Sequence, residues 1–200
     1  MRLLRWPPHR RRSPRRAREA DSAADVFLRQ RVRVGLPLVL VCAWLARPTP
    51  PAIAIGAAIA LLGVAVRGTA ASHLTKHAGL ATSGPYAITR NPLYLGSAMI
   101  ACGLLVAAHS WIAGLLCVAY FAVFYPSVIE REERRLRARY GAEFDEYAAR
   151  VPRFWPRLGA AASTRFAWSW RLYARNGEYT AALTVLIGFL LLWLKMYRGT

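Results

Sequence analysis

The chain has 200 residues, of which 56% are hydrophobic, yet it carries a formal net charge of +18. A chain of this length is expected to form one compact unit. Apolar and charged residues occupy separate parts of the sequence, which argues against an ordinary soluble domain. The alternative, a soluble bundle of unusually apolar helices, is disfavoured because sustained apolar runs are typical of membrane spans. Five runs lack Lys, Arg, Asp and Glu, namely 34–46, 52–66, 93–108, 111–129 and 181–194.

These runs predict an all-α, polytopic membrane bundle with about five transmembrane helices and an additional charged helix on the cytoplasmic side. The first two runs flank Arg47-Pro48-Thr49-Pro50-Pro51, which predicts a turn and an antiparallel hairpin. Pro126 lies inside the fourth run. We expect it to kink that helix and free a backbone carbonyl, as is tolerated beside a protein cavity.

The basic residues predict the orientation. Of the 28 Lys and Arg residues, 25 lie in residues 1–33, 67–91 and 130–180, which five spans would place on one face. The positive-inside rule makes that face cytoplasmic. We therefore expect an integral membrane protein with a cytoplasmic N terminus, a basic arm over 1–33 and a membrane domain over 34–200. Nucleic-acid binding is disfavoured because no base-reading module accompanies the basic residues.

The three cysteines suggest no redox or metal chemistry. Cys42, Cys102 and Cys117 all lie within apolar runs, so buried thiols are favoured over disulfides or metal ligands. No metal site is predicted.

Polar residues suited to chemistry gather in His73–Tyr94 and in Glu130–Arg153, at the two ends of the hairpin formed by the third and fourth runs. An antiparallel hairpin brings its two ends together, so these segments should converge. The residues expected to meet are Tyr86, Arg90, Asn91, Tyr94, Glu132 and Glu133.

The segment from Val128 to Ala149 has helical character. Glu130 with Arg134, and Glu133 with Arg137, are i, i+4 pairs in the favourable order. Gly141 is expected to interrupt or cap this helix. The remaining helical signal is an apolar face formed by Phe144, Tyr147 and Val151.

Gly84–Gly96 is compatible by itself with a simple helix start, because Asn91 suits the N-cap and Pro92 the first helical position. The wider pattern resembles the isoprenylcysteine carboxyl methyltransferase family and its bacterial relatives, and the related phospholipid methyltransferases share much of it. The resemblance covers about residues 67–157. It is carried by residues 80–96, Glu132-Glu133-Arg134-Arg135-Leu136, Tyr140-Gly141, Phe144, Tyr147 and Val151-Pro152-Arg153-Phe154-Trp155-Pro156.

The resemblance implies a membrane methyltransferase without a Rossmann domain that uses S-adenosylmethionine, bound at the cytoplasmic end of the bundle. The resemblance to bacterial proteins implies the bacterial inner membrane as its location. The methyl acceptor would be an amphiphilic or lipid-like molecule that enters from the bilayer. The implied cofactor-binding residues are Leu80, Ala81, Tyr86, Asn91, Pro92, Leu93, Tyr94 and Glu132. Arg90, His73 and Glu133 are the catalytic candidates; an amine or hydroxyl acceptor would need a general base, for which His73 or Glu133 is suited.

Physical roles can be given to the cofactor residues. The Glu132 carboxylate can bind the amino group or the ribose hydroxyls. The rings of Tyr86 and Tyr94 can lie against the sulfonium or the adenine. Asn91 and free amides at a helix start can bind the carboxylate.

Two positions depart from the family pattern and leave the acceptor open. Asn91 stands where the eukaryotic enzymes have His, and Val128 stands where the family has an Arg directed at the prenylcysteine substrate. His73 and Lys76 resemble residues of the bacterial relatives, but they fit a solvated loop equally well.

Two other functions remain open. Sterol-type membrane reductases that use NADPH share a similar Arg-His-Pro-x-Tyr motif, but they typically have Asp and Cys where this chain has Glu132-Glu133 and Arg134-Arg135. The other is a non-catalytic lipid-binding protein.

Overall fold

The computed structural model describes residues 30–31, 33–74, 79–157 and 168–198. Most of the predicted arm over 1–33, together with Lys76 and Ala78, lies outside the described residues. All the regular secondary structure assigned within those ranges is helical, which confirms the all-α prediction there.

Each of the five apolar runs forms a helix, but only three of these helices are long and apolar enough to cross a membrane. They are α2 (Pro50–His73), α4 (Trp111–Tyr140) and α7 (Tyr179–Arg198). The other two, Arg33–Leu45 and α3 (Pro92–Ala108), are shorter. At 1.5 Å per residue, the 17 residues of α3 extend about 25 Å, less than a hydrocarbon core of about 30 Å. The predicted count of five spans is therefore not confirmed.

The ends of the helices follow local sequence signals. The predicted turn at Arg47–Pro51 is confirmed in position, and α2 begins within it at Pro50. His109, in the left-handed conformation, ends α3, and the Ser110 hydroxyl accepts a hydrogen bond from the Ala113 amide at the start of α4. The fourth apolar run and the charged segment form one continuous helix, α4, of 30 residues.

Gly141 interrupts that helix as predicted. It has φ +53° and separates α4 from α5 (Ala142–Arg150). The expected apolar face of α5 is confirmed for Phe144 and Tyr147, which are both buried. The predicted i, i+4 ion pair of Glu130 with Arg134 forms at 3.1 Å on the surface.

Helix pairing differs from the expected order of hairpins. The main partner of α2 is α3, because Gly56 lies against Gly103, and Gly63 against Gly96, so closely that no side chain would fit between the backbones. The helix Arg33–Leu45 packs on α4 instead, where the Cys42 thiol lies 3.9 Å from the Ala113 carbonyl oxygen. The expected hairpin of the first two runs is therefore wrong as a packing unit.

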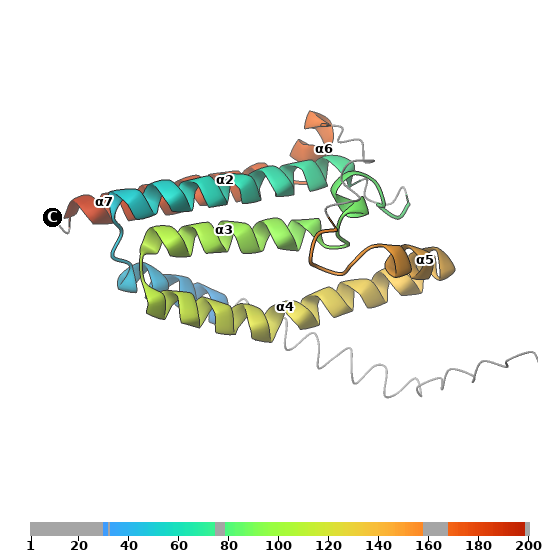
Figure 1. The fold of residues 1–200 in the computed structure, drawn as a ribbon, viewed down its shortest axis with the longest axis horizontal. Helices are drawn as coiled ribbons and strands as arrows, with labels where there is room; N and C mark the ends of the chain where they lie inside the picture. The colour runs from blue at the N-terminus through green and yellow to red at the C-terminus, as the bar shows by residue number, and fades with distance from the viewer. Residues whose placement is uncertain (1–29, 32, 75–78, 158–167, 199–200) are drawn as a thin grey trace, which may run out of the picture.

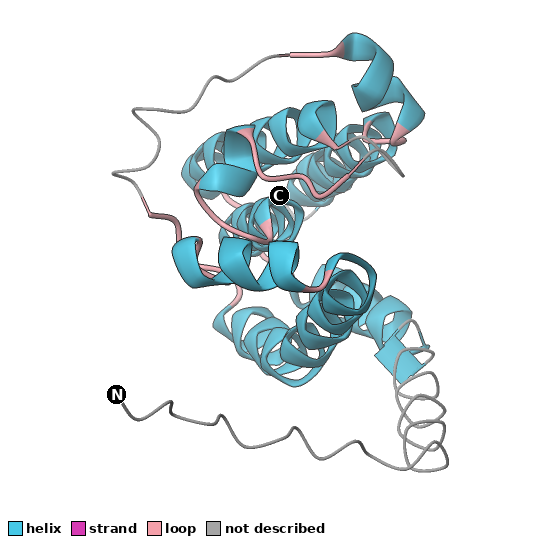
Figure 2. Cartoon of the chain, turned by 90° about the vertical axis from the view of Figure 1, so that its right-hand side faces the viewer, coloured by secondary structure: helices cyan, strands magenta, loops and turns pink. Residues whose placement is uncertain are grey.

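The last helix, α7, packs against α2 and α3. Its outer surface carries exposed apolar side chains such as Leu186 and Leu191, as expected for a face in contact with lipid. In Figure 1 the helices run roughly side by side, and the polar segments of α5 and α6 (Trp170–Arg175) gather at one end. The one-turn 3-10 helix η1 (Gly84–Ala87) lies at this same end, which Figure 2 views face on.

Candidate functional site

The two sequence segments expected to converge are joined at this polar end by backbone and side-chain hydrogen bonds. The stretch 88–91 precedes α3, and the stretch 152–157 follows α5. Their hydrogen bonds are Arg90 N to Pro152 O at 2.9 Å, Arg157 N to Ile88 O at 3.0 Å, Thr89 Oγ1 to Phe154 O at 3.0 Å and Asn91 Nδ2 to Arg153 O at 2.8 Å. The prediction that these two segments converge is confirmed.

Glu133 forms the ionic centre of this junction. It is 5% exposed, and its Oε2 accepts hydrogen bonds from Arg153 Nε at 3.0 Å and Nη2 at 2.6 Å. Arg90 Nη1 lies 3.3 Å from the other oxygen, Oε1. The predicted pair of Glu133 with Arg137 is therefore wrong, because two arginines from the neighbouring segments take the carboxylate, whereas Arg137 pairs with Asp145 at 2.6 Å.

The arginines and the carboxylate form a cluster with one excess positive charge. Hydrogen bonding to Glu133 raises the pKa of Arg153 above its usual value. Within the described residues, two buried atoms of the cluster, Arg90 Nε and Glu133 Oε1, lack a hydrogen-bond partner. Unsatisfied buried polar atoms are rare in folded proteins, so a polar ligand at this junction would satisfy a need that the described residues leave unmet.

Tyr147 connects α5 to the turn before α3. Its hydroxyl donates a 2.7 Å hydrogen bond to the carbonyl oxygen of Tyr86. Burial is the largest cause that raises the pKa of both phenols, so both keep their protons at neutral pH. Sequence reasoning placed Tyr147 on a packing face but did not find this bond.

Two of the cofactor candidates, Tyr86 and Tyr94, lie within electrostatic range of a third, Glu132. Glu132 is exposed on α4, one position from the buried Glu133. It lies close enough to Tyr86 and Tyr94 to act electrostatically on both hydroxyls. An accessible carboxylate beside two aromatic side chains fits a ligand that carries both an amino group and a sulfonium.

The start of α3 holds three more of the cofactor candidates. Asn91 occupies the N-cap position, and Pro92 is fully buried at the start of the helix. The expected side-chain cap by Asn91 is wrong, because its amide group is bound to the Arg153 carbonyl. The Asn91 side chain therefore does not bind the backbone amides of Leu93 and Tyr94 in the first turn of α3. An anion site at a helix start requires such unpaired amides.

The other candidates lie farther along the connection between α2 and α3. Leu80 and Ala81 are half-buried there. His73 is the last residue of α2, and its Nδ1 lies 2.8 Å from the Thr69 carbonyl oxygen. Its ring fills the space beside Gly84, where φ is +60° and no side chain would fit. The structure thus joins Arg90 and Glu133 in one cluster and places His73 against the η1 turn.

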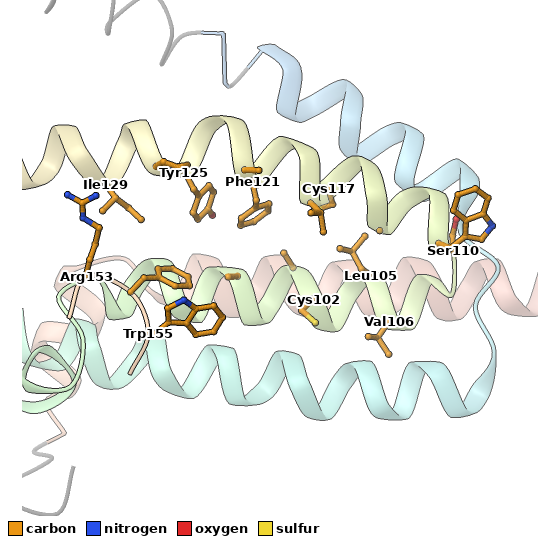
Figure 3. Close-up of a pocket in the computed structure, with 18 of the residues that line it drawn as sticks. Cys102, Leu105, Val106, Ser110, Cys117, Phe121, Tyr125, Ile129, Arg153 and Trp155 are labelled. Atoms are coloured by element: carbon orange, nitrogen blue, oxygen red, sulfur yellow. The ribbon is translucent and has the colours of Figure 1, made fainter. Parts of the chain in front are cut away.

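A large apolar groove separates α3 from α4, with a volume of about 1190 Å³ (Figure 3). It extends from Ser110 at one end to Arg153 and Trp155 at the polar end. Pro126 lines it, as the sequence predicted for a proline beside a cavity. Cys102 also lines the groove and is exposed, which corrects the expectation that all three thiols are buried.

Sequence reasoning missed a second ionic network. Arg67 binds Glu178 through two hydrogen bonds of 2.9 Å, from Nε to Oε2 and from Nη2 to Oε1. Arg67 Nη1 also donates to the Leu93 carbonyl at 3.3 Å and to Ser97 Oγ at 2.5 Å. A signal was available, because Arg67 is the one charged residue of α2 apart from histidine, and Glu178 is the one acidic residue after Glu146.

Comparison with known proteins shows which family this part of the chain resembles. Residues 51–143 match the family model described as phospholipid methyltransferase. The match includes α2 from its second residue, all of α3 and α4, and the connection between α2 and α3, and it confirms the resemblance found in the sequence. This part of the chain is therefore similar to a methyltransferase family, and it is rich in apolar helices of membrane-spanning character.

Two curated bacterial proteins are similar to part of the chain. They are the cobalt-zinc-cadmium resistance protein CzcN of Cupriavidus metallidurans and the nickel-cobalt-cadmium resistance protein NccN of Alcaligenes xylosoxydans xylosoxydans. Each is 41% identical over 83 residues, which are 42% of this chain and 38% of the relative. The match thus spans well under half of either relative. No solved structure matches the chain significantly.

Proposed function

We propose that this protein is an S-adenosylmethionine-dependent methyltransferase of the membrane that acts on an amphiphilic, lipid-like acceptor. The observation that carries the proposal is the hydrogen-bonded junction of the two motifs, which lies at an uncapped helix start and at the end of an apolar groove. An accessible carboxylate lies within electrostatic range of two tyrosines there. The match to a methyltransferase family supports it and favours it over the NADPH-dependent reductase.

The proposed cofactor contacts use the groups at the start of α3 and on α4. Glu132 would bind the amino group or the ribose hydroxyls by charge-assisted hydrogen bonds. Tyr86 and Tyr94 would present their rings to the sulfonium or the adenine. The first-turn amides of Leu93 and Tyr94 would bind the carboxylate. The cofactor, when bound, supplies a methyl group that its sulfonium has already activated.

The chain's own contribution to the reaction is then alignment and exclusion of water. Holding the acceptor in line with the methyl group can contribute about 7–11 kcal/mol. We assign Glu133 and Arg90 to positioning, because the Glu133 carboxylate already faces two guanidinium groups that fix the 88–91 and 152–157 stretches. Where the acceptor is an amine or a hydroxyl, His73 is the remaining candidate for the base.

The α3–α4 groove is proposed as the acceptor path. Its lining is almost entirely apolar, and its polar end lies at Arg153, in the cluster formed with Glu133 and Arg90. Tyr125, which lines the groove, packs edge-on against Tyr94 with ring centroids 5.7 Å apart. A hydrocarbon chain in the groove would therefore bring its polar group to the side of the bundle where the cofactor candidates lie.

The proposed binding of the cofactor is tested by equilibrium binding of radiolabelled S-adenosylmethionine to the purified protein in detergent. We expect Glu132→Ala to weaken binding at least tenfold, about the effect of losing one charge-assisted hydrogen bond. Glu130→Ala is the matched control, because Glu130 is also exposed on α4 but pairs with Arg134. Absence of binding to the wild type, or equal binding by both variants, would refute the proposal. Thermal shifts with NADPH test the reductase in parallel.

The proposal that the α3–α4 groove is the path of the methyl acceptor is tested with Gly114→Leu. Gly114 lines the groove, and a side-chain atom placed there meets nothing within 4 Å, so the substitution fills the groove without disturbing the packing. Methyl transfer to total membrane lipid extract should fall, whereas affinity for S-adenosylmethionine should not change. Unchanged transfer would exclude the groove as the acceptor path. A lipid-binding protein without catalysis predicts no transfer from the wild type.

A further inference from the structure

The stretch Trp168–Glu178, which precedes α7, contacts both ends of the connection between α2 and α3, the second of them through Arg67. We propose that Asn176 and Glu178 are positioning residues, which set the distance between the end of α2 and the start of α3. The stretch Trp168–Glu178, which contains both, is called the C-terminal bracket below. The proposal rests on the proposed function for its consequence, but its geometry stands independently. The bracket lies outside residues 51–143, which match the methyltransferase family.

Asn176 fixes the end of α2. Its side-chain amide donates two hydrogen bonds of 2.9 Å, to the carbonyl oxygens of Ala71 and Leu74. Ala71 lies in the last turn of α2 and Leu74 is its C-cap residue, where a helix leaves backbone carbonyls without their usual i+4 partners. Asn176, which lies outside α2, thus caps the C-terminal end of this helix, where His73 lies and the connection to α3 begins.

Glu178 fixes the start of α3 through Arg67. The carboxylate is 8% exposed and holds two nitrogens of the Arg67 guanidinium. The third nitrogen, Nη1, is thereby directed at the Leu93 carbonyl and the Ser97 hydroxyl, both in α3. A planar guanidinium held at two corners has its third donor fixed in direction, so Glu178 orients a contact that it does not make itself.

Aromatic packing supports the same placement. The rings of Trp168 and Tyr173 lie 5.3 Å apart between centroids, and both lie against Gly68 in α2, where no larger residue would fit. The bracket therefore contacts α2 at Gly68 and at its last turn, and reaches α3 through Arg67. The residues between those points, from Gly79 to Asn91, include four of the eight cofactor candidates, Leu80, Ala81, Tyr86 and Asn91. Their spacing depends on a segment that contributes no atom to the proposed ligand contacts.

The first test needs no ligand. Hydrogen exchange reports the opening of the hydrogen-bonded amides of Tyr86, Ile88 and Arg90 in the full-length protein. We expect Asn176→Ala and Glu178→Gln to speed their exchange roughly tenfold, the change that losing one or two hydrogen bonds produces. Lys195→Met is the matched control. Lys195 ties the far end of α7 to the carbonyls of Ala43 and Trp44, so its loss should loosen α7 without affecting these amides.

The second test is affinity for S-adenosylmethionine, measured at a temperature where circular dichroism shows every variant folded. The two bracket variants should weaken binding about tenfold, Glu178→Asp should restore part of it, and Lys195→Met should match the wild type. If Glu178→Gln fails to fold, the result with Asn176→Ala decides whether the bracket affects binding, because this substitution leaves no buried charge unpaired.

The outcomes separate the two proposals. Equal exchange at Tyr86, Ile88 and Arg90 in Asn176→Ala, Lys195→Met and the wild type would overturn the bracket. Faster exchange in the bracket variants, with no S-adenosylmethionine bound by the wild type, would leave the bracket standing and refute the proposed function. Faster exchange with unchanged affinity would overturn the claim that the bracket positions the cofactor residues.

Discussion

Replacing Glu133 by Gln tests whether the arginine cluster holds the two motifs together. The substitution keeps the size of the side chain and removes its charge. Arg90 and Arg153 would then face each other around a neutral amide. Their side chains are 14% and 52% exposed, respectively. Arg153 can turn into solvent, whereas Arg90 stays buried without a counterion.

The magnitude follows from that difference in exposure. Removing one partner of a buried ion pair costs about 3–5 kcal/mol, chiefly because a charge is left buried and uncompensated. Here only one of the two arginines is left buried without a counterion. We therefore expect a loss at the lower end of this range, about 3 kcal/mol of unfolding free energy. Arg153→Gln leaves Arg90 and Glu133 balanced and should cost about 1 kcal/mol.

The assay is thermal unfolding in detergent micelles followed by circular dichroism. Glu130→Gln is the control, because Glu130 and Arg134 are 57% and 56% exposed and such pairs contribute about 0–1 kcal/mol. The double variant Arg90→Met/Glu133→Leu should recover part of the loss, since it removes both charges. The reasoning is refuted if Glu133→Gln and Glu130→Gln lower the midpoint equally, or if Arg153→Gln destabilises as much as Glu133→Gln.

Two further predictions concern packing and pH. Gly63→Ala would push the added methyl group into the Gly96 backbone and Ile100, and should lower the unfolding free energy by about 1–3 kcal/mol. The added methyl group of Gly114→Ala meets no neighbour, so this variant should be as stable as the wild type or more stable. The unfolding midpoints of the two variants check this. Because burial raises the pKa of Tyr86 and Tyr147, the unfolded chain loses these protons first, so the unfolding free energy should fall as pH rises above about 10. Tyr147→Phe should flatten that dependence, and unfolding measured across this pH range would contradict the reasoning if the slope did not change.

Much of the site could be predicted from the sequence because local signals determine it. Apolar runs determine which segments become helices, and Gly141 and the prolines near residue 50 determine where helices end. The order of motifs along one hairpin predicted that Arg90 and Glu133 would meet, and their ion pair confirms it. Periodicity alone could not choose the partner of Glu133, because Arg137 at i+4 and the distant Arg153 both satisfy the charge.

Only the tertiary structure decided how the helices pair and what they enclose. Close contact at Gly56 and Gly63 makes α2 the partner of α3, which leaves α3 apart from α4 and opens the groove. The same packing brings Arg67 to Glu178 across 111 residues of sequence. Such contacts depend on which faces meet, whereas the sequence by itself determines only the faces. Sequence thus established a helical chain with a methyltransferase motif, and packing decided where that motif is held and what can reach it.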